Sequence, residues 1–235
     1  MTADTGSRLD VLSAVAVHAE IERLVPQFMS SSKLDVRVRY DVNPAVARRV
    51  LEGETFDVGL TNPWYVDEMI SQGKVVPDVH VPFGRIPLAI GALASRRETI
   101  ANTSESIRAL LIEADSIAYT SIGTSGKNFL RALEQMNLRD TLYDRLRAMG
   151  AGEPVIAAAA GDVQYAIAPL SRIIAAHGVD AVATFPADLG LNIDMSMFIS
   201  VDSENCEKAK RLIQFLSDPA LNAYLSSNGV SRFEL

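Results

Sequence analysis

The sequence predicts an α/β fold with mixed, mostly parallel sheets and helices on both faces, divided into two lobes. Short apolar runs that suit buried strands alternate with amphipathic segments of helical period along most of the 235 residues. A glycine follows several helical segments, as at Gly53, Gly73 and Gly161, where it lets the backbone leave the helix. The sequence contains no internal repeat and no low-complexity linker. We therefore expect the lobes to be joined by two crossing strands, within 84–94 and 192–200.

The first half of the chain follows this alternation in order. Strands are expected at Leu9–Leu12, Leu34–Tyr40 and Phe56–Leu60, and a longer apolar run follows at Ile86–Ala94. Helices are expected at Ala16–Met29, Asn43–Leu51, Pro63–Ser71 and Thr103–Glu113. Pro44 stands in the first turn of the second helix, where its missing N–H costs little.

The second half continues in the same way. Strands are expected at Ser116–Thr120, Val163–Ala168, Val182–Phe185 and Met195–Val201. Helices are expected at Lys127–Met136, Thr141–Ala148, Glu153–Ala160, Leu170–His177, Glu204–Ser217 and Pro219–Ser226. Ligands of such sheets bind beyond the carboxyl ends of the strands, where loops lead into helices. The strand-to-helix loops are therefore the places to look for a site.

Composition narrows the classes of function. Hydrophobic residues make up 48% and charged residues 22% of the chain, so it can build a sizeable core. The formal net charge is −7 with no basic stripe, which disfavours nucleic acid as a partner. Cys206 is the single cysteine, which excludes an internal disulfide and a cysteine-only metal site. His18, His80 and His177 show no metal-binding spacing, so we expect no metal and no cofactor.

The start of the chain bears on its location. It shows no basic segment followed by a long apolar run, and no stretch of the sequence is apolar for long enough to span a bilayer. As written, the sequence predicts a cytoplasmic protein without a membrane span. The same sequence suits the periplasm if a native leader has been removed.

The most informative loop lies within Ser116–Leu133, where a strand enters a loop rich in Gly, Ser and Thr and an amphipathic helix follows. Free N–H groups and hydroxyls at a positive helix end can hold a small anion. The candidate ligand-binding residues of this loop are Ser121, Thr124, Ser125 and Gly126, and Lys127 can add charge. The loop is not a Walker A sequence, which disfavours a nucleotide. Simple helix capping is the alternative reading.

Three other strand-to-helix loops supply further candidates. Ser13 and Ala14 follow the first strand, Asn43 follows the second, and Thr61 and Asn62 follow the third. Their hydroxyl, amide and backbone N–H groups suit a ligand oxygen. Each could instead serve only as a helix cap.

Four more residues could take part. Arg85 at the first proposed crossing could pair bidentately with a carboxylate, or be solvated or structurally paired. Gln164 could face the cleft from the second lobe, or be an ordinary strand residue. His18 and Tyr65 are the candidates for transferring a proton. Alternatively, His18 could be an ordinary residue of its helix, and Tyr65 could pack between lobes. No GxSxG sequence is present to indicate a serine nucleophile.

Several stretches, taken in their order along the chain, carry a resemblance to a known family. They are VLSAVAVHAEIERLVPQF, ARRVLEGETFDVGL, SIAYTSIGTSGKNFLRALEQMNL, GDVQYAIAPLSRII and AKRLIQFLSDPALNAYLSSNGV. The chain resembles the bacterial extracellular solute-binding proteins of the molybdate-binding-protein-like kind from Leu9 to Phe233.

The resemblance implies a periplasmic-binding-protein type II fold, with lobe I at 1–84 and 198–235, lobe II at 85–197 and a ligand cleft between them. Ser13 matches the first ligand-binding serine of oxyanion-binding members. Val42-Asn43-Pro44 replaces a serine-rich segment of the molybdate pattern, and a tyrosine expected near Pro169 is missing. These departures put molybdate in doubt and favour an organic carboxylate.

Two functions remain open at this point. The first is a solute-binding protein that closes around a small organic anion, with a di- or tricarboxylate favoured over molybdate, and with an ABC permease as partner only if it is exported. The second is an isomerase of a small unsaturated carboxylate that works by metal-free proton transfer, because the resembled branch also includes aconitate isomerase.

Overall fold

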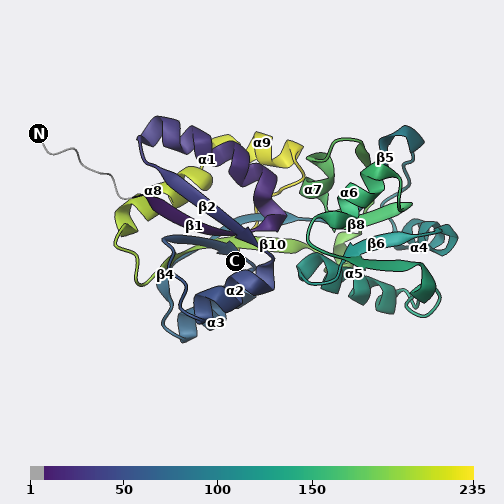
Figure 1. The fold of residues 1–235 in the computed structure, drawn as a ribbon, viewed down its shortest axis with the longest axis horizontal. Coiled ribbons are helices and arrows are strands. Elements are labelled where there is room, and N and C mark those ends of the chain that lie inside the picture. Colours follow the sequence, from purple (N-terminus) through teal and green to yellow (C-terminus); the bar gives the residue numbers. More distant parts are fainter. Residues whose placement is uncertain (1–7) are drawn as a thin grey trace, which may run out of the picture. The chain divides into compact units, whose positions relative to one another are not determined.

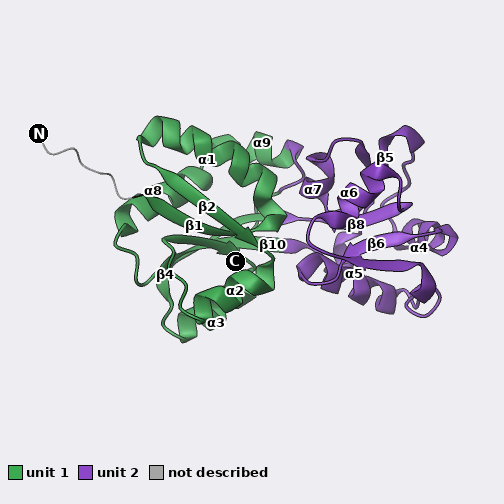
Figure 2. Ribbon diagram, viewed as in Figure 1, with its two compact units in different colours: residues 1–84, 194–226, 231–235 green, residues 85–193, 227–230 purple. Residues whose placement is uncertain are grey.

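The structure is a computed structural model that describes residues 8–235, and it divides into two compact units (Figure 1). Unit 1 comprises the chain up to Gly84 together with Asp194–Ser226 and Ser231–Leu235. Unit 2 comprises Arg85–Ile193 and Ser227–Val230, as Figure 2 shows. Residues 194–197 and 227–230 thus lie in the opposite unit from the one that the sequence-based boundaries give them. Strands β4 and β10 both run across a boundary between the units.

The sheet of unit 1 has the strand order β2-β1-β3-β10-β4. Its strands are β1 (Leu9–Ala14), β2 (Val36–Asp41), β3 (Val58–Thr61), β4 (Val75–Ile86) and β10 (Ile193–Ser200). Strand β1 is parallel to β2 and β3, whereas β10 is antiparallel to β3. The carboxyl ends of β1, β2 and β3 therefore meet at one edge of the sheet.

Helices cover both faces of this sheet. They are η1 (Val15–Val17), α1 (His18–Ser32), α2 (Asn43–Leu51), α3 (Pro63–Ser71), α8 (Cys206–Leu216), η5 (Pro219–Leu221) and α9 (Asn222–Ser227). Helices α1 and α8 pack on one face, and α2 and α3 pack together on the other (Figure 1). The longer helices bury an apolar stripe, as Ile21, Leu24 and Phe28 of α1 illustrate.

The sheet of unit 2 has the order β7-β6-β8-β5-β9. Its strands are β5 (Leu88–Leu93), β6 (Ile117–Thr120), β7 (Leu146–Met149), β8 (Tyr165–Pro169) and β9 (Val179–Thr184). Its helices are η2 (Ala94–Arg96), α4 (Ser104–Glu113), α5 (Thr124–Gln135), η3 (Tyr143–Arg145), α6 (Glu153–Ala160), α7 (Leu170–Ile174) and η4 (Ala187–Leu189). Strand β6 is parallel to β7 and β8, and β5 is antiparallel to β8 and β9. The predicted α/β class with mixed sheets is confirmed.

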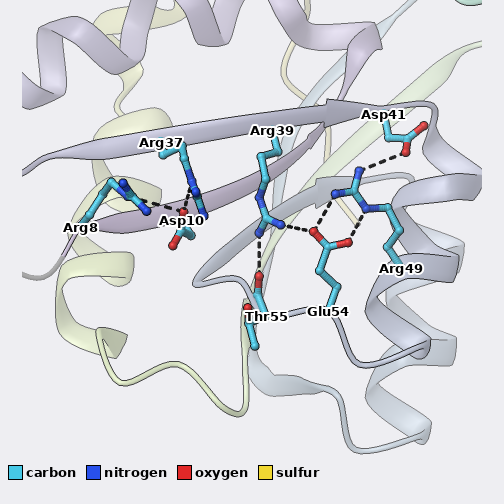
Figure 3. Close-up of polar contacts among 8 residues, drawn as sticks. All are labelled: Arg8, Asp10, Arg37, Arg39, Asp41, Arg49, Glu54 and Thr55. Carbon is cyan, nitrogen blue, oxygen red and sulfur yellow. Dashed lines mark hydrogen bonds and ion pairs between the residues drawn. The ribbon is translucent and has the colours of Figure 1, made fainter.

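Two clusters of ion pairs connect the edge strand β2 of unit 1 to its neighbours (Figure 3). Asp10 on β1 pairs with Arg37 on β2 at 2.6 Å. Glu54 accepts from both Arg39 on β2 and Arg49 on α2, and Arg49 also pairs with Asp41 at 3.1 Å. The hydrogen bond from Arg49 is the main reason why the pKa of Glu54 falls below its ordinary value. The cluster around Glu54 therefore holds the loop after α2 against β2.

Two local expectations were wrong. Residues 141–148 were expected to form a helix, but they form η3 and strand β7, because Leu146–Met149 pairs in register with β6. Strand β4 was missed, since Pro77 and Pro82 interrupt its pattern. Strand β4 can contain these prolines because it lies at the edge of the sheet, where a missing N–H donor is tolerated, unlike in a central strand.

Candidate functional site

The polar candidates of unit 1 gather at the carboxyl edge of its parallel strands. Ser13 and Ala14 end β1, and Thr61 ends β3, with Ser13 in register with Leu60. Asn43 begins α2 and Asn62 immediately precedes α3. All five residues are buried. The sequence placed these residues after separate strands, and the parallel pairing brings them to one edge.

Hydrogen bonds fix three of these side chains. The hydroxyl of Thr61 donates to the side-chain oxygen of Asn43 at 2.9 Å and lies 3.1 Å from its backbone oxygen. The amide of Asn62 donates to the carbonyl of Asp194 at 2.7 Å, which anchors the start of α3 to β10. Within the described residues, the side chain of Ser13 makes only one hydrogen bond, a long one from its hydroxyl to the carbonyl of Ala14 at 3.3 Å. Its hydroxyl can therefore rotate toward a ligand oxygen at little cost.

Two helices begin at this edge without a side-chain cap. Neither Val42 before α2 nor Asn62 before α3 accepts a hydrogen bond with its side chain from the first turn, within the residues that the structure describes. Both helices have nine residues and carry a proline in their first turn. The leading N–H groups of a helix carry a partial positive charge and prefer an acceptor. This edge is therefore suited to an anion.

The two candidate proton-transfer residues lie in unit 1 near the same edge. His18 begins α1, and its ring lies 4.4 Å from the ring of Tyr40, centroid to centroid. The hydroxyl of Tyr40 donates to Glu22, and burial, reinforced by Glu22, raises the pKa of that phenol. Tyr65 is half-buried in the first turn of α3, with its ring 5.8 Å from that of the exposed Trp64. Their catalytic role stays a prediction.

The loop between β6 and α5 is the corresponding feature of unit 2. The backbone N–H and hydroxyl of Ser121 both donate to the carbonyl of Met149, at 2.8 and 3.0 Å, which ties the loop to the end of β7. Gly123 has φ 133° and precedes α5, whose first residue is the buried Thr124. A Cβ on Gly126 would lie 1.8 Å from the carbonyl oxygen of Thr120. The close approach of helix and strand thus requires glycine at 126.

The other candidates of unit 2 lie apart from this loop. Gln164 accepts from the N–H of Asp115 at 2.8 Å and comes just before β8. Because β8 is parallel to β6, Gln164 lies at the amino ends of these strands, away from Ser121 at the carboxyl end. Arg85 is half-buried near the end of β4. The structure therefore brings Ser121, Thr124, Ser125 and Gly126 together, but not Gln164 with them.

One polar pair beside the edge of unit 1 was not singled out from the sequence. Nε2 of His80 on β4 lies 2.9 Å from the hydroxyl oxygen of Ser196 on β10. That hydroxyl lies 3.4 Å from the carbonyl oxygen of Thr61, and Nδ1 of His80 lies 3.7 Å from Asp67 on α3. His80 and Ser196 are 116 positions apart, so no local pattern could connect them.

Residues 8–235 offer neither a metal-binding cluster nor a membrane-spanning helix. No group of acidic, histidine or cysteine side chains among them is placed to hold a metal ion. None of their helices is long and apolar enough to cross a membrane.

Residues 9–231 match the sequence profile of the bacterial extracellular solute-binding proteins, and the chain belongs to this family. Among curated proteins, it is similar to an aconitate isomerase of a Pseudomonas species, with 25% identity over 237 positions that cover 98% of this chain and 90% of the relative. Both findings agree with the resemblance inferred from the sequence motifs.

Solved structures share the fold. The periplasmic molybdate-binding protein of Azotobacter vinelandii superposes with a TM-score of 0.83 at 17% identity, covering 97% of this chain and all of that one (100%). The sulfate-binding protein SubI of Mycobacterium tuberculosis gives a TM-score of 0.78 at 16% identity, covering 97% of this chain and 88% of that one. At such identities the likeness concerns the fold alone, and it confirms the two-lobe periplasmic-binding-protein architecture.

Proposed function

We propose that this solute-binding protein binds a small organic anion with two or three carboxylates. One observation carries the proposal: at the carboxyl edge of unit 1, the buried hydroxyl of Ser13 and the buried side-chain amide of Asn43, which Thr61 orients, meet the side-chain-uncapped starts of α2 and α3. Dipoles that are already oriented can replace the water shell of an anion without reorganising. The protein carries a net charge of −7, so a local positive potential at this edge must come from such dipoles.

Two features favour a carboxylate over molybdate. Val42-Asn43-Pro44 offers one side-chain amide where the molybdate pattern implies serines, which reduces the hydroxyl donors available to a tetrahedral oxyanion. The full-length relative is named for its action on aconitate, a tricarboxylate.

A thermal-shift panel tests the proposal. The panel contains cis-aconitate, trans-aconitate, citrate, succinate, molybdate, sulfate and phosphate. A bound anion at a hundred times its Kd stabilises the folded protein by about 2.7 kcal/mol, which raises Tm by roughly 5–11 °C for a chain of this size. A shift with molybdate alone would refute the carboxylate class, and no shift with any anion would refute anion binding.

Variants in each unit locate the site. Ser13→Ala in unit 1 and Ser125→Ala in unit 2 each remove one hydroxyl, and we expect each to weaken binding by about fivefold. Ser95→Ala, at an exposed position, is the matched control and should bind as the unaltered protein does. Titration calorimetry with the strongest anion of the panel measures all three. If only one of Ser13→Ala and Ser125→Ala loses affinity for the anion, the site lies in the unit that carries that serine.

A second candidate function is isomerisation of an unsaturated tricarboxylate, which the full-length similarity to an aconitate isomerase favours. The reaction removes a proton from a carbon beside the double bond and returns one at the far end of the allylic system. It needs a base and acid near the anion but no metal, and His18 and Tyr65 of unit 1 are the proposed groups.

Incubation with cis-aconitate in D₂O tests this candidate. Proton NMR should show trans-aconitate with deuterium at the reprotonated carbon, and His18→Gln or Tyr65→Phe should lower the rate at least about a hundredfold. An unchanged spectrum would refute aconitate isomerisation while leaving binding to be decided by the thermal shifts.

The partner and location follow from which function holds. For a binding protein that is exported, we propose an ABC permease as the partner and the periplasm as the location. For an isomerase, we propose the cytoplasm. Fractionation of cells that express the native gene distinguishes the two.

A further inference from the structure

A row of polar groups crosses the sheet of unit 1 next to the proposed anion-binding edge. The strand order β3-β10-β4 places Ser196 of β10 between Thr61 of β3 and His80 of β4. Ser196 is in register with Thr61, and its side chain is fully buried. Its hydroxyl oxygen lies 2.9 Å from Nε2 of His80 and 3.4 Å from the carbonyl oxygen of Thr61. Ser196 is thus the link between the histidine and the edge.

The hydroxyl of Ser196 has one proton and two possible acceptors. In neutral His80, the carboxylate of Asp67 near Nδ1 favours the proton on that nitrogen, because a carboxylate can only accept. Nε2 is then an acceptor, and Ser196 must donate to it. When His80 is protonated, Nε2–H donates to Ser196, and the hydroxyl proton turns to the carbonyl of Thr61. The protonation state of His80 therefore decides whether the carbonyl of Thr61 receives a hydrogen bond from the hydroxyl of Ser196.

Thr61 connects the hydroxyl of Ser196 to the proposed anion-binding edge. Its carbonyl belongs to the peptide that links it to Asn62, which precedes α3, and its hydroxyl holds the side chain of Asn43. A hydrogen bond to that carbonyl restrains the peptide between the two residues. Protonation also adds a positive charge to unit 1 next to the edge. Both effects favour an anion at lower pH.

The environment of His80 sets the pH range. Its side chain is 13% exposed, and burial lowers the pKa of the imidazole below its ordinary value, partly opposed by Asp67. Asp67 comes from α3, and β10 contributes the neutral hydroxyl of Ser196. The Asp67 side chain is itself 74% exposed, so solvent screens its charge. The transition is therefore expected below pH 6.5.

We propose that His80 is a positioning residue that acts through Ser196 on Thr61, so that anion binding strengthens when His80 is protonated. The effect on affinity rests on the proposed anion-binding function, whereas the coupling of His80 to Thr61 can be measured without any ligand.

The coupling is tested by NMR on the ligand-free protein between pH 4.5 and 8. The backbone N–H signals of Thr61 and Asn62 should titrate with the same midpoint as the imidazole of His80. In Ser196→Ala, His80 should still titrate while these two amides no longer follow it. In His80→Gln, which keeps a neutral donor in place of Nε2–H, the two amides should not respond to pH in this range. His177→Gln, an exposed position in unit 2, is the matched control and should behave as the unaltered protein does.

The affinity is tested by calorimetry with cis-aconitate at pH 5.5 and pH 7.5. The affinity at pH 5.5 is divided by the affinity at pH 7.5 for each protein. This ratio should be about fivefold larger in the unaltered protein and in His177→Gln than in His80→Gln. Titration of the ligand's own carboxylates is common to all variants and cancels in this comparison.

The outcomes separate the two ideas. Amides that ignore the titration of His80, or that follow it equally well in Ser196→Ala, overturn the coupling, because the effect would then be absent or act through space. Absence of cis-aconitate binding in the unaltered protein counts against the proposed function alone, and the amide titration then still decides the role of His80.

Discussion

Replacement of Gly126 by alanine gives the sharpest test of how unit 2 builds its loop. Two physical effects predict opposite outcomes. Gly126 lies in the first turn of α5, where alanine has the better helix propensity and would stabilise by about 1 kcal/mol. However, the added Cβ would lie 1.8 Å from the carbonyl oxygen of Thr120, whereas ordinary contact begins at 3.4 Å.

The overlap should dominate. The start of α5 and the end of β6 would have to separate by about 1.6 Å, against a densely packed interior. Overpacking of this kind against backbone costs about 3 kcal/mol or more, because the backbone cannot turn aside as a flexible side chain can. Tm should fall by roughly 6–12 °C.

Calorimetric or circular-dichroism melting of Gly126→Ala measures this loss. Gly53→Ala is the control, because its added Cβ meets no atom within 4 Å, while its φ of +91° costs strain without overlap. The control should lose only about 1–2 kcal/mol. If Gly126→Ala melts at or above the temperature of the unaltered protein, the packing of α5 on β6 as described is refuted.

Two further predictions concern unit 1. Glu54→Gln should destabilise by about 1–2 kcal/mol at pH 7, because Arg39 and Arg49 lose a partly exposed anionic partner. Since the folded-state pKa of Glu54 is lowered, its contribution is present above its ordinary pKa and is lost as pH falls through the folded value. Chemical denaturation should therefore show the difference at pH 7 and a narrowing gap below pH 4.5, and a gap independent of pH would contradict the role of the charge. Thr61→Val keeps the shape of the side chain but removes the donor to Asn43, and should cost about 1–2 kcal/mol because a buried amide oxygen loses its partner. Thr99→Val, at an exposed position, is the control for melting, and an equal Tm for both variants would show that the bond to Asn43 contributes nothing.

Local patterns predicted much of the fold. Helical periodicity and a trailing glycine located α2, α3 and α6, since both signals are local and strong. The patterns failed where pairing with distant strands decided the outcome. The pattern around Leu146–Met149 resembles that of a helix, but the segment pairs with the edge of β6 and forms strand β7. Strand β4 carries two prolines that only an edge position tolerates.

The candidate site divides in the same way. The position of residues at or just after the end of a strand, such as Ser13, Thr61 and Ser121, was predictable, because a strand-to-helix loop is recognisable from its immediate neighbours. Gln164 shows the limit of this reasoning: it directly precedes β8, at the amino end of the strand, whereas the loop with Ser121 follows the carboxyl end of the neighbouring strand β6. His80 gave no signal at all, since its partner Ser196 is far away in the chain.

The sequence by itself determined most of the alternation of strands and helices, the family, and the residues that end β1, β3 and β6, because these depend on neighbours along the chain. Only the tertiary structure decided which donors are already committed, as Thr61 is to Asn43, and which polar groups meet across the sheet, as His80 and Ser196 do. Strand order and register set those meetings, and they arise from packing between segments that share no local pattern.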